Sequence, residues 1–447
     1  MRAKLQQKGF YHLLTFSKVE KLFLSKFKKR LSKLLYQLFI RLYPFFIHLV
    51  SPFNSKAKLW LKGREKIFER MRKVIKHENP VIWIHCSSLG EFEQGRPLIE
   101  KLRTIYPSYK ILLTFFSPSG YEVRKNYEGA DYIFYLPADN DNNAKEFLDI
   151  TKPALIFFVK YEFWYYYLNE AKNRSIPLLL ISAIFRKNEP FFAKHGNFHR
   201  SMLSCFYYFF VQNDKSLLLL NSIGFKQNVT VSGDTRFDRV IEIAEQFRPL
   251  DIIERFCAGT DVIVAGSTWS DDDKNISAYA NAKSNIKFII APHDISKQRI
   301  NECLQLYKKA VLFSAVTDAE LSSDINVIII DNVGLLSRLY KYAVISYIGG
   351  GFKKEGVHNV LEAAVYGKPV VFGPVYKKYI EAIELLDNGG GTSIQNYAEL
   401  ETTLDEFLKK DQHYTNVCKA ALHYVYSKQG ATDKILHFIQ ENRLLTR

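Results

Sequence analysis

The chain has 447 residues, which is too long for one ordinary hydrophobic core and indicates two domains. Hydrophobic residues make up 47% of the chain and charged residues 24%, a globular balance that excludes a largely disordered chain. The five cysteines are scattered and form no Cys-x-x-Cys pair. This pattern predicts reduced thiols and argues against a disulfide framework or a zinc site.

The formal net charge of +16 lies entirely in residues 1–80, which carry 20 Lys and Arg against 4 Asp and Glu. The rest of the chain carries 42 residues of each sign. A nucleic-acid enzyme usually spreads basic groups through its working domains, so this distribution argues against nucleic acid as a partner.

The basic end is also amphipathic. Apolar residues recur there at steps of three and four and predict one face of a helix: Leu24, Phe27, Leu31, Leu34, Leu35, Leu38 and Leu42. Basic residues lie among and beside them: Lys26, Lys28, Lys29, Arg30 and Lys33. The stretch 34–50 is too short and interrupted for a transmembrane span, and no signal-peptide cleavage pattern follows it. We predict that residues 1–50 form a helical segment in the membrane interface, on the cytoplasmic side; the alternative is a soluble helix that docks on its own domain.

From residue 81 onward, short apolar runs alternate with longer amphipathic stretches, as in βαβ units around a parallel sheet. The first series of predicted strands covers 81–86, 110–115, 132–135, 154–159, 177–182, 206–211 and 229–232. Helical patterns between them include 91–105, 142–150 and 161–173.

A second series follows a helix-like connector at about 236–258. Its predicted strands cover 261–266, 286–292, 325–330, 343–350 and 369–373, and a helical pattern fills about 395–445. We therefore expect an α/β protein with two doubly wound Rossmann-like domains, 51–240 and 241–447, facing a central cleft; the last helices are candidates for packing back on the first domain. Open α/β sheets bind ligands at the carboxyl ends of their strands. Glycosyltransferases of the two-Rossmann type have this layout, but so do some epimerases, and the fold alone does not choose between them.

Residues 349–374, "GGGFKKEGVHNVLEAAVYGKPVVFGP", carry the clearest binding pattern of the second half. A strand runs into three glycines, and a helix is predicted over 359–366. A helix N-terminus preceded by glycines binds phosphate readily. Glu362, in the first turn of that helix, is a candidate ribose ligand; the alternative is a capping Asn359 with a Glu that the helix dipole favours.

Two other loops of the second half follow predicted strands. "GSTWSDDD" (266–273) resembles an Asp-x-Asp metal motif, but acidic residues also suit the first turn of a helix, and this second interpretation is favoured. "IIAPHDI" (289–295) places His293 just past a buried strand, where it is either a structural cap or a ligand.

In the first half, "VIWIHCSSLGEFEQG" (81–95) ends a strand and opens a helix at Glu91, which is either an ordinary acidic helix start or a catalytic base. "FFVKYEFWYYYL" (157–168) places Lys160 and Glu162 after a buried strand. "VTVSGDTRFDR" (229–239) places Arg236 after Gly233, where it is either an anion contact or a solvated residue.

These motifs resemble, in order, those of the lipid A 3-deoxy-D-manno-octulosonate (Kdo) transferases. The matching segments are "WIHCSSLGE", "TFFSPSGYE", "YLPAD", "KYEFWYYYL", "GDTRFDR", "AGST", "APHDI" and the 349–374 stretch. The resemblance runs from about residue 34 to the C-terminus, and residues 1–33 look like an extension. It implies a GT-B fold and an inverting, metal-independent glycosyltransferase without a cofactor. It also implies transfer of Kdo from CMP-Kdo to a lipid A precursor, lipid IVA, in lipopolysaccharide core synthesis, on the cytoplasmic face of the inner membrane of a Gram-negative bacterium.

The resemblance assigns roles to individual residues. Ser88-Leu89-Gly90-Glu91 matches the family's Ser-Val-Gly-Glu-type motif, whose glutamate is the general base. Glu162 and Arg236 match residues that help the transition state, although lysine is usual at the second position. The CMP-binding segments match Pro292, His293, Val333, Gly334, Leu335, His358, Asn359, Val360, Leu361 and Glu362. The sequence departs from the family in two places: no arginine follows Pro292, and Val357 stands where a glycine is usual.

The chemistry of Kdo transfer needs such residues. A sugar hydroxyl attacks well only when a base removes its proton, and Glu91 would be more basic if buried but more acidic beside a helix N-terminus. CMP leaves with a single phosphate, so a metal clamp is less necessary than for a diphosphate. Ser87, Ser88 and Gly90 are small and leave room for an acceptor sugar. Two alternatives stay open: a soluble nucleotide-sugar epimerase or hydrolase of the same fold, and a non-catalytic membrane adaptor.

Overall fold

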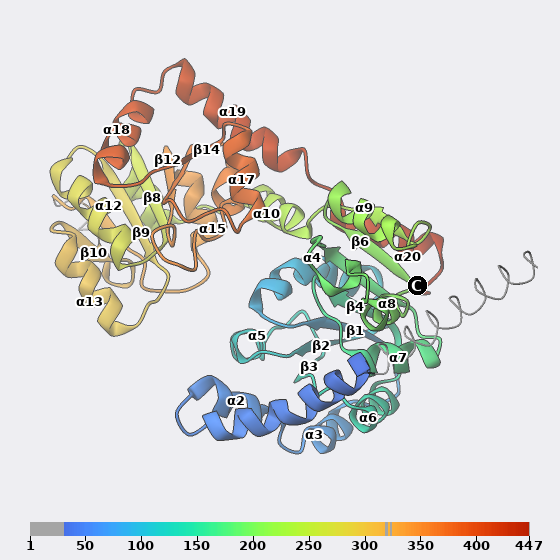
Figure 1. Ribbon diagram of the computed structural model, residues 1–447. Helices are drawn as coiled ribbons and strands as arrows, with labels where there is room; N and C mark the ends of the chain where they lie inside the picture. The colour runs from blue at the N-terminus through green and yellow to red at the C-terminus, as the bar shows by residue number, and fades with distance from the viewer. Residues whose placement is uncertain (1–30, 318–320, 322–323, 447) are drawn as a thin grey trace, which may run out of the picture. The chain divides into compact units, whose positions relative to one another are not determined.

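The computed structural model describes residues 31–317, 321 and 324–446. Within them the chain forms two compact units. The first unit ends at Thr235 and regains the chain from Gly430 onward, and the second unit comprises Arg236–Gln429. The predicted division at 240 and 241 lies close to this boundary, and the last helix belongs to the first unit (Figure 1).

The first unit is built on a seven-stranded sheet of order β3-β2-β1-β4-β5-β6-β7, in which every pairing is parallel (Figure 1). Its strands are β1 (Val81–Cys86), β2 (Lys110–Phe115), β3 (Tyr132–Tyr135), β4 (Pro153–Val159), β5 (Leu178–Ala183), β6 (Tyr208–Val211) and β7 (Val229–Val231). Because β1 and β4 are neighbours in the middle of the sheet, their carboxyl ends and the loops that follow them lie side by side.

Both faces of this sheet are buried. Along β1, Trp83 packs into the core on one face, whereas Ile82 and Ile84 pack into the core on the other. The Trp83 face is covered by α3 (Ile67–Val74), α6 (Asp141–Thr151) and α7 (Tyr165–Asn173), and the opposite face by α4 (Leu89–Ile105) and α20 (Ala431–Glu441). The unit also contains α2 (Ser55–Arg64), α5 (Pro118–Arg124), η1 (Pro190–Phe192), α8 (Asn197–Leu203) and α9 (Asp214–Ser222).

The second unit repeats the plan with a parallel sheet of order β10-β11-β9-β8-β12-β13-β14. Its strands are β8 (Val262–Thr268), β9 (Lys287–Pro292), β10 (Ala310–Leu312), β11 (Val327–Ile329), β12 (Ile345–Ile348), β13 (Val370–Phe372) and β14 (Gly391–Ser393). Its helices are α10 (Thr235–Glu245), α11 (Asp251–Cys257), α12 (Ser270–Ala282), α13 (Lys297–Leu306), α15 (Leu336–Leu339), α16 (Leu361–Ala364), α17 (Ile380–Asp387), α18 (Tyr397–Leu408) and α19 (Gln412–Tyr426), with short turns η2 (Phe313–Ala315) and η3 (Tyr340–Tyr342). Apolar residues again form a core on each face.

The predicted parallel α/β architecture is confirmed. The structure differs from the prediction in two edge strands and in the bounds of some helices. The edge strands β10 and β14 were not predicted, because each has three residues and bonds to one neighbour only. The predicted connector at 236–258 is two helices, since Pro249 cannot continue a helix. The predicted helix over 359–366 is shorter, Leu361–Ala364, and the chain then turns through Gly367 at a φ of 62°.

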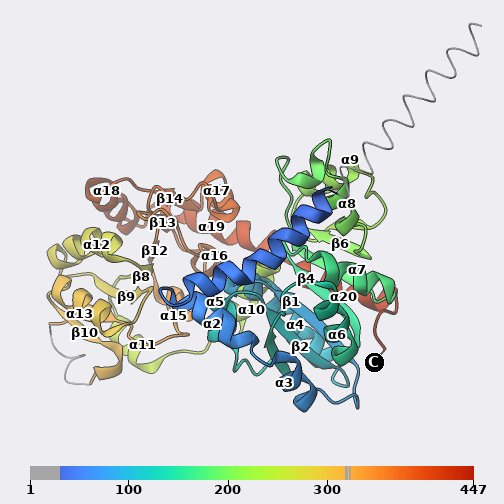
Figure 2. The ribbon, with the colours of Figure 1, turned by 60° about the horizontal axis from the view of Figure 1, so that its bottom comes forward.

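A helix over residues 31–50, the 31–50 helix, lies along the first unit (dark blue in Figure 2). Ile40 on its inner face is buried, and Tyr36 and Tyr43 pack on aromatic residues of the unit. Its outer face carries exposed apolar residues, which include the described part of the predicted stripe: Leu31, Leu34, Leu35, Leu38, Phe39, Leu42, Phe45, Phe46, Leu49 and Val50. The predicted residues Leu24 and Phe27 lie outside the described residues. No helix within the described part of the chain is long and apolar enough to cross a membrane.

The aspartates of "GSTWSDDD" lie in the first turn of α12, as the favoured interpretation predicted. Asp272 accepts hydrogen bonds from the backbone N–H groups of Trp269 and Gly350, both at 2.9 Å. Asp273 is fully buried; it forms an ion pair with Arg299 and accepts a hydrogen bond from Tyr307 at 2.7 Å. Both carboxylates therefore hold the second unit together.

We predict that Asp273→Ala lowers the free energy of unfolding of the second unit by about 3 kcal/mol, because it leaves the buried Arg299 guanidinium without its main partner. Asp271 is the matched control in the same helical turn, since its surface ion pair with Lys274 contributes about 0–1 kcal/mol. Urea denaturation followed by circular dichroism measures both variants. Equal losses would show that Asp273 has no special structural role.

Candidate functional site

The first candidate centre lies where β1 passes into α4. Ser88 is the N-cap of α4 in extended backbone, and Glu91 is the third residue of the helix. The Ser88 hydroxyl donates to the Glu91 carboxylate, which also accepts from the backbone N–H groups of Ser88 and Glu91. Glu91 therefore does cap its own helix, as the plainer of the two interpretations holds.

Burial also perturbs Glu91. Burial and then the negative charge of Glu162 raise the pKa of the Glu91 carboxyl, while the Lys160 ammonium and the two N–H groups lower it. The net direction is upward from the usual 4.5, so burial prevails over the helix terminus. Glu91 thus combines a structural cap with a carboxylate that binds a proton more tightly than an ordinary glutamate does, the direction of shift that a general base needs.

Glu162 lies in the loop after β4, beside the end of β1. It is 7% exposed, and its carboxylate lies 2.6 Å from Trp164 Nε1 and 3.2 Å from His85 Nε2. Lys160, two residues earlier, has a positive φ of 69°, an uncommon conformation for a residue with a side chain. The sheet therefore brings the two predicted carboxylates, Glu91 and Glu162, close enough to interact electrostatically.

His85 is a member of this centre that the sequence did not single out. It is fully buried, and its Nδ1 lies 2.9 Å from Thr114 Oγ1, which accepts a hydrogen bond from Trp83 Nε1 at 2.8 Å. On the other side of the ring, His85 Nε2 lies 3.2 Å from the Glu162 carboxylate and 3.1 Å from Trp164 Nε1. The available signal was a histidine within an otherwise apolar, buried strand.

The segment 114–123, at the end of β2 and the start of α5, packs against the turn between β1 and α4. Ser117 N–H donates to the Ser87 carbonyl at 2.8 Å. A Cβ on Gly120 would lie 2.3 Å from the Phe115 ring and 3.1 Å from the Ser88 carbonyl carbon, so a glycine is needed for this approach. A Cβ on Gly90, in contrast, would meet nothing closer than 3.8 Å, and that residue is exposed. Ser87, Ser88 and Gly90 therefore remain predicted acceptor contacts.

The chain passes from the first unit to the second within the segment 233–236. Asp234 accepts a hydrogen bond from Gln94 of α4 at 3.0 Å, and the Thr235 hydroxyl donates to the Gln94 carbonyl. Arg236 belongs to the second unit, where its guanidinium forms a 2.7 Å ion pair with Glu381. It is therefore not a solvated surface residue.

The second candidate centre lies at the carboxyl ends of β8, β9 and β12. His293 follows Pro292, the last residue of β9, and its ring stacks on His358 at a centroid distance of 4.3 Å and on Trp269 at 4.7 Å. Trp269 Nε1 donates to His358 Nε2 at 3.0 Å, and the Lys353 ammonium lies 3.7 Å above the indole ring. The sequence predicted the two histidines but not Trp269 or Lys353; the tryptophan directly after a strand end was the available signal.

Burial and then His293 lower the pKa of His358 to about 4, and burial lowers the pKa of His293. Both rings are therefore neutral at neutral pH. Because His358 Nε2 accepts the indole N–H, its Nδ1 carries the proton and is a hydrogen-bond donor.

The other predicted donor-binding residues lie in two nearby loops of this unit. The Asn359 side chain accepts from the Leu361 N–H at 3.2 Å and donates to Glu362 at 3.0 Å. Val360 and Leu361 are fully buried in the core, so only their backbone is available to a ligand. In the loop after β11, Val333 is 80% exposed, Gly334 has a positive φ of 94°, and Leu335 caps α15.

The glycines before this site are required by close packing. A Cβ on Gly349 would lie 2.3 Å from the Ser267 carbonyl oxygen, and one on Gly351 would lie 2.5 Å from the Gly373 nitrogen. Val357, the departure from the family pattern, is buried and donates its N–H to the Val375 carbonyl at 2.9 Å. Within the described residues, no cluster of three or more acidic, histidine or cysteine side chains could hold a metal ion.

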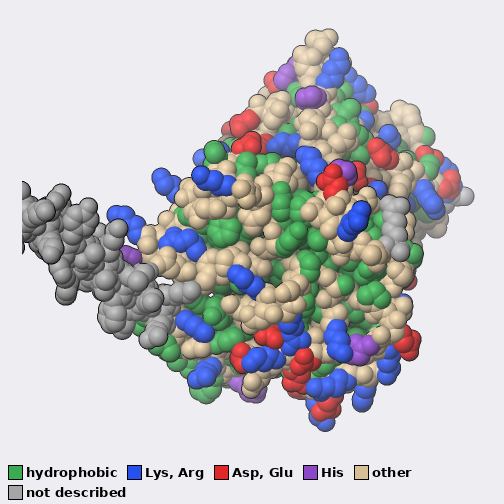
Figure 3. All heavy atoms as spheres, turned by 90° about the vertical axis from the view of Figure 1, so that its right-hand side faces the viewer, with side chains coloured by type: hydrophobic (Ala, Val, Ile, Leu, Met, Phe, Trp, Pro, Cys, Tyr) green, Lys and Arg blue, Asp and Glu red, His purple; other side chains and the backbone are tan. Residues whose placement is uncertain are grey.

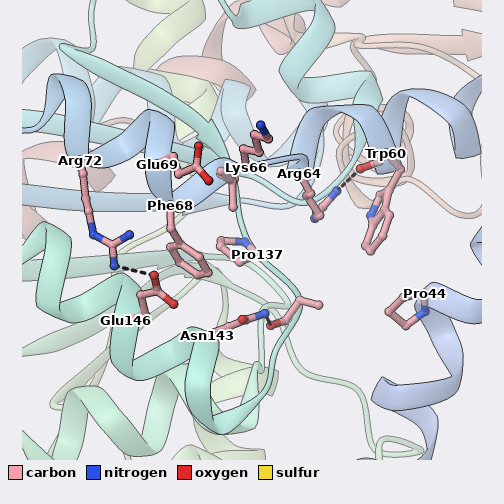
Figure 4. Close-up of a pocket in the computed structure, with 12 residues that line it drawn as sticks. Pro44, Trp60, Arg64, Lys66, Phe68, Glu69, Arg72, Pro137, Asn143 and Glu146 are labelled. Atoms are coloured by element: carbon pink, nitrogen blue, oxygen red, sulfur yellow. Dashed lines mark hydrogen bonds and ion pairs between the residues drawn. The ribbon is translucent and has the colours of Figure 1, made fainter.

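A cavity of about 450 Å³ in the first unit lies apart from the acidic centre (Figure 4). Pro44, Trp60, Phe68 and Pro137 contribute apolar walls, and Arg72 faces Glu146 across one end at 2.6 Å. Neither Glu91 nor Glu162 lines it.

Solved structures share the fold of the chain. UDP-GlcNAc 2-epimerase from Neisseria meningitidis matches with a TM-score of 0.57 at 17% identity, over 81% of this chain and 100% of that one. A glycosyltransferase from Rickettsia africae matches with a TM-score of 0.52 at 15% identity, over 82% and 99%. The fold is thus the two-Rossmann, GT-B-like fold common to these nucleotide-sugar epimerases and glycosyltransferases.

Sequence comparisons show which proteins of this class the chain is similar to. The family described as 3-deoxy-D-manno-octulosonic-acid transferase (kdotransferase) matches residues 64–239. The 3-deoxy-D-manno-octulosonic acid transferase of Aquifex aeolicus is 29% identical over 343 residues, which cover 75% of this chain and 88% of the relative. The chain is thus similar to Kdo transferases, both in the part that the family matches and along most of its length.

One relative is a longer protein. The bifunctional glycosyltransferase/methyltransferase of Fusobacterium nucleatum is 28% identical over 380 residues, which cover 81% of this chain. The chain spans only 55% of that relative's length.

We predict opposite shifts of the Glu91 pKa in two neighbouring variants. Glu162→Gln removes a negative charge and lowers the pKa, whereas Lys160→Met removes a positive charge and raises it. A carbon-13 NMR titration of the carboxyl groups measures both, with Lys125→Met, at the surface beside Glu122, as the control. Shifts of the same sign would refute this account of the site.

Proposed function

We propose that the protein transfers Kdo from CMP-Kdo to a lipid A precursor, lipid IVA, with inversion and without a metal ion or cofactor. The observation that carries the proposal is the Glu91 carboxyl, whose pKa is raised beside Glu162 at the edge of the first sheet, in a chain that is similar to Kdo transferases. Glu91 follows β1, one of the two neighbouring strands in the middle of the sheet, and its carboxylate binds a proton more tightly than an ordinary glutamate does, as a general base must.

In the proposed reaction, deprotonated Glu91 accepts the proton of the acceptor hydroxyl as that oxygen bonds to the anomeric carbon. The bond from the anomeric carbon to the phosphate of CMP breaks with its electron pair leaving on the phosphate. A single displacement of this kind inverts the anomeric centre. Ser88 donates to Glu91 and keeps its carboxylate directed, while His85 and Trp164 hold Glu162.

The donor site is proposed at the second centre. A cytosine ring suits the flat rings of Trp269 and His293, and Lys353 with the Nδ1 proton of His358 would contact phosphate. Arg236 would stabilise the transition state by contacting the anionic donor. The donor would compete with Glu381 for its guanidinium. A monophosphate leaving group makes smaller demands on such contacts than a diphosphate does.

We also propose that the 31–50 helix lies on the cytoplasmic face of the inner membrane. A helix docked only on its own domain buries its apolar side, whereas this helix turns its leucines and phenylalanines outward. The adjoining sequence is basic, which suits anionic headgroups. On the face of the molecule in Figure 3, Lys and Arg side chains are spread over the surface and mixed with Asp and Glu, and no single large basic patch is seen, which argues against nucleic acid as the partner.

We predict that Glu91→Gln lowers kcat by on the order of 10²–10⁴-fold, because the amide cannot accept the hydroxyl proton. The assay uses the purified full chain, CMP-Kdo and a tetra-acylated lipid A precursor, with product mass as the readout. Glu93→Gln is the matched control, since Glu93 lies in the same helical turn but forms a surface ion pair with Arg124. In the wild type, kcat should rise with pH through the raised pKa of Glu91.

The outcome separates the candidate functions. No Kdo transfer by the wild type under any detergent condition would overturn the proposal, and conversion of a UDP-sugar would favour an epimerase or hydrolase. Full activity of Glu91→Gln would remove its assignment as the base.

We predict that Leu38→Glu combined with Leu42→Glu lowers binding to vesicles of anionic phospholipid on the order of 10²- to 10⁴-fold, because two apolar contacts of about 1.5–3 kcal/mol each are lost. Leu218→Glu, which changes an exposed leucine of α9, is the control. Co-sedimentation with the vesicles is the measurement. Unchanged binding of the double variant would rule out this face as the contact.

A further inference from the structure

The first backbone N–H groups of α7 are capped by side chains that lie far from α7 in the sequence. The first N–H groups of a helix have no partner inside it and are usually satisfied by the N-cap side chain. Here the N-cap is Trp164, which provides no such acceptor. Because α7 directly follows the Glu162 loop, whatever holds these N–H groups also fixes that loop.

Two distant side chains supply the cap. The Asp139 carboxylate, 1% exposed, accepts from the N–H groups of Tyr166 and Tyr167, both at 3.1 Å. The Tyr36 hydroxyl of the 31–50 helix accepts from the Tyr165 N–H at 3.2 Å and donates to Asp139 at 2.5 Å. The first three N–H groups of α7 are thus all satisfied by this pair.

An aromatic route joins the same two elements. Tyr43 of the 31–50 helix packs on Phe116 at a ring distance of 5.9 Å, and Phe116 packs on Trp164 at 4.5 Å. Trp164 in turn donates to Glu162. The 31–50 helix therefore reaches the Glu162 loop by one polar route and one aromatic route.

Two cavities flank the Asp139 segment. A cavity of about 450 Å³ is lined by Pro137 and Ala138, and another of about 430 Å³ by Asn140, Asp141 and Asn142. Figure 4 shows Pro137 and Asn143 at the first of them. Between the two cavities the buried Asp139 carboxylate is held by its hydrogen bonds to Tyr36, Tyr166 and Tyr167.

We infer that Tyr36 and Asp139 are positioning residues, which couple the seating of the 31–50 helix on the first unit to the placement of the Glu162 carboxylate. A lipid surface that holds the outer face of the helix would then stabilise the working geometry of the acidic centre. The effect on turnover rests on the proposed function, whereas the coupling itself does not.

The test compares Tyr36→Phe with Gln37→Ala in the full chain. Tyr36→Phe keeps the ring but removes the hydroxyl that caps α7, whereas Gln37 bonds only to the Tyr166 hydroxyl, at 2.7 Å, across the same interface. Two readouts are taken: kcat and KM with CMP-Kdo and the lipid precursor, and the NMR pKa of Glu91, which senses the position of the Glu162 charge. Thermal unfolding checks that each variant is folded.

Tyr36→Phe is expected to lower kcat roughly 10- to 100-fold with little change in the KM for CMP-Kdo, because the loop is displaced while the second unit is untouched. It should lower the pKa of Glu91 in the direction of Glu162→Gln, and Gln37→Ala should do neither. Tyr43→Leu, which interrupts the aromatic route without touching the buried carboxylate, should act in the same direction as Tyr36→Phe.

Equal effects of Tyr36→Phe and Gln37→Ala, or an unchanged Glu91 pKa in both Tyr36→Phe and Tyr43→Leu, would overturn the coupling. If the wild type transfers no Kdo, the proposed function fails, but the NMR arm still decides the coupling.

Discussion

The parallel pairing of β1 with β4 is the constraint on which the acidic centre depends. It places the end of β1, with His85, beside the loop that carries Glu162. A buried carboxylate is tolerated only with polar partners around it; the indole of Trp164 donates to Glu162, and the imidazole of His85 lies 3.2 Å from it. Glu91, at the first turn of the helix after β1, then lies within the field of that charge, and its raised pKa is a consequence of strand order and burial.

The second unit uses the same architecture differently. Its buried carboxylates, Asp272 and Asp273, are committed to N–H, hydroxyl and guanidinium partners and hold the loops after β8 and β12 together. Its exposed edge is instead formed by neutral rings, Trp269, His293 and His358, with Lys353 above them. One sheet edge therefore presents proton-accepting groups, and the other presents flat rings and a cation, which suits two substrates of different chemistry.

Strand ends were the most predictable part of the site. Glu91 and Glu162 each follow a strongly apolar run, so a parallel sheet had to bring both to one edge. His85 was hidden because its partners, Thr114 and Glu162, come from other strands, and a pattern along one strand does not show what lies across it. The edge strands β10 and β14 were too short for any periodicity to appear. Spacing predicted the apolar stripe from Leu31 to Leu42 and left two directions for it, towards a membrane or towards its own domain; in the structure it faces outward.

The outward direction of this apolar stripe links the surface of the molecule to the acidic centre. The 31–50 helix contacts the first unit largely through Tyr36, Gln37 and Tyr43, side chains with polar ends, and leaves its apolar side to the surroundings. Any surface that covers the outer face of this helix therefore stabilises the helix in its docked position. Because the inner face caps α7 and supports Trp164, this stabilisation also favours the seated arrangement of the Glu162 loop. Linkage makes the effect reciprocal: a ligand that binds better to the ordered acidic centre must strengthen the hold of the helix on a lipid surface by the same factor.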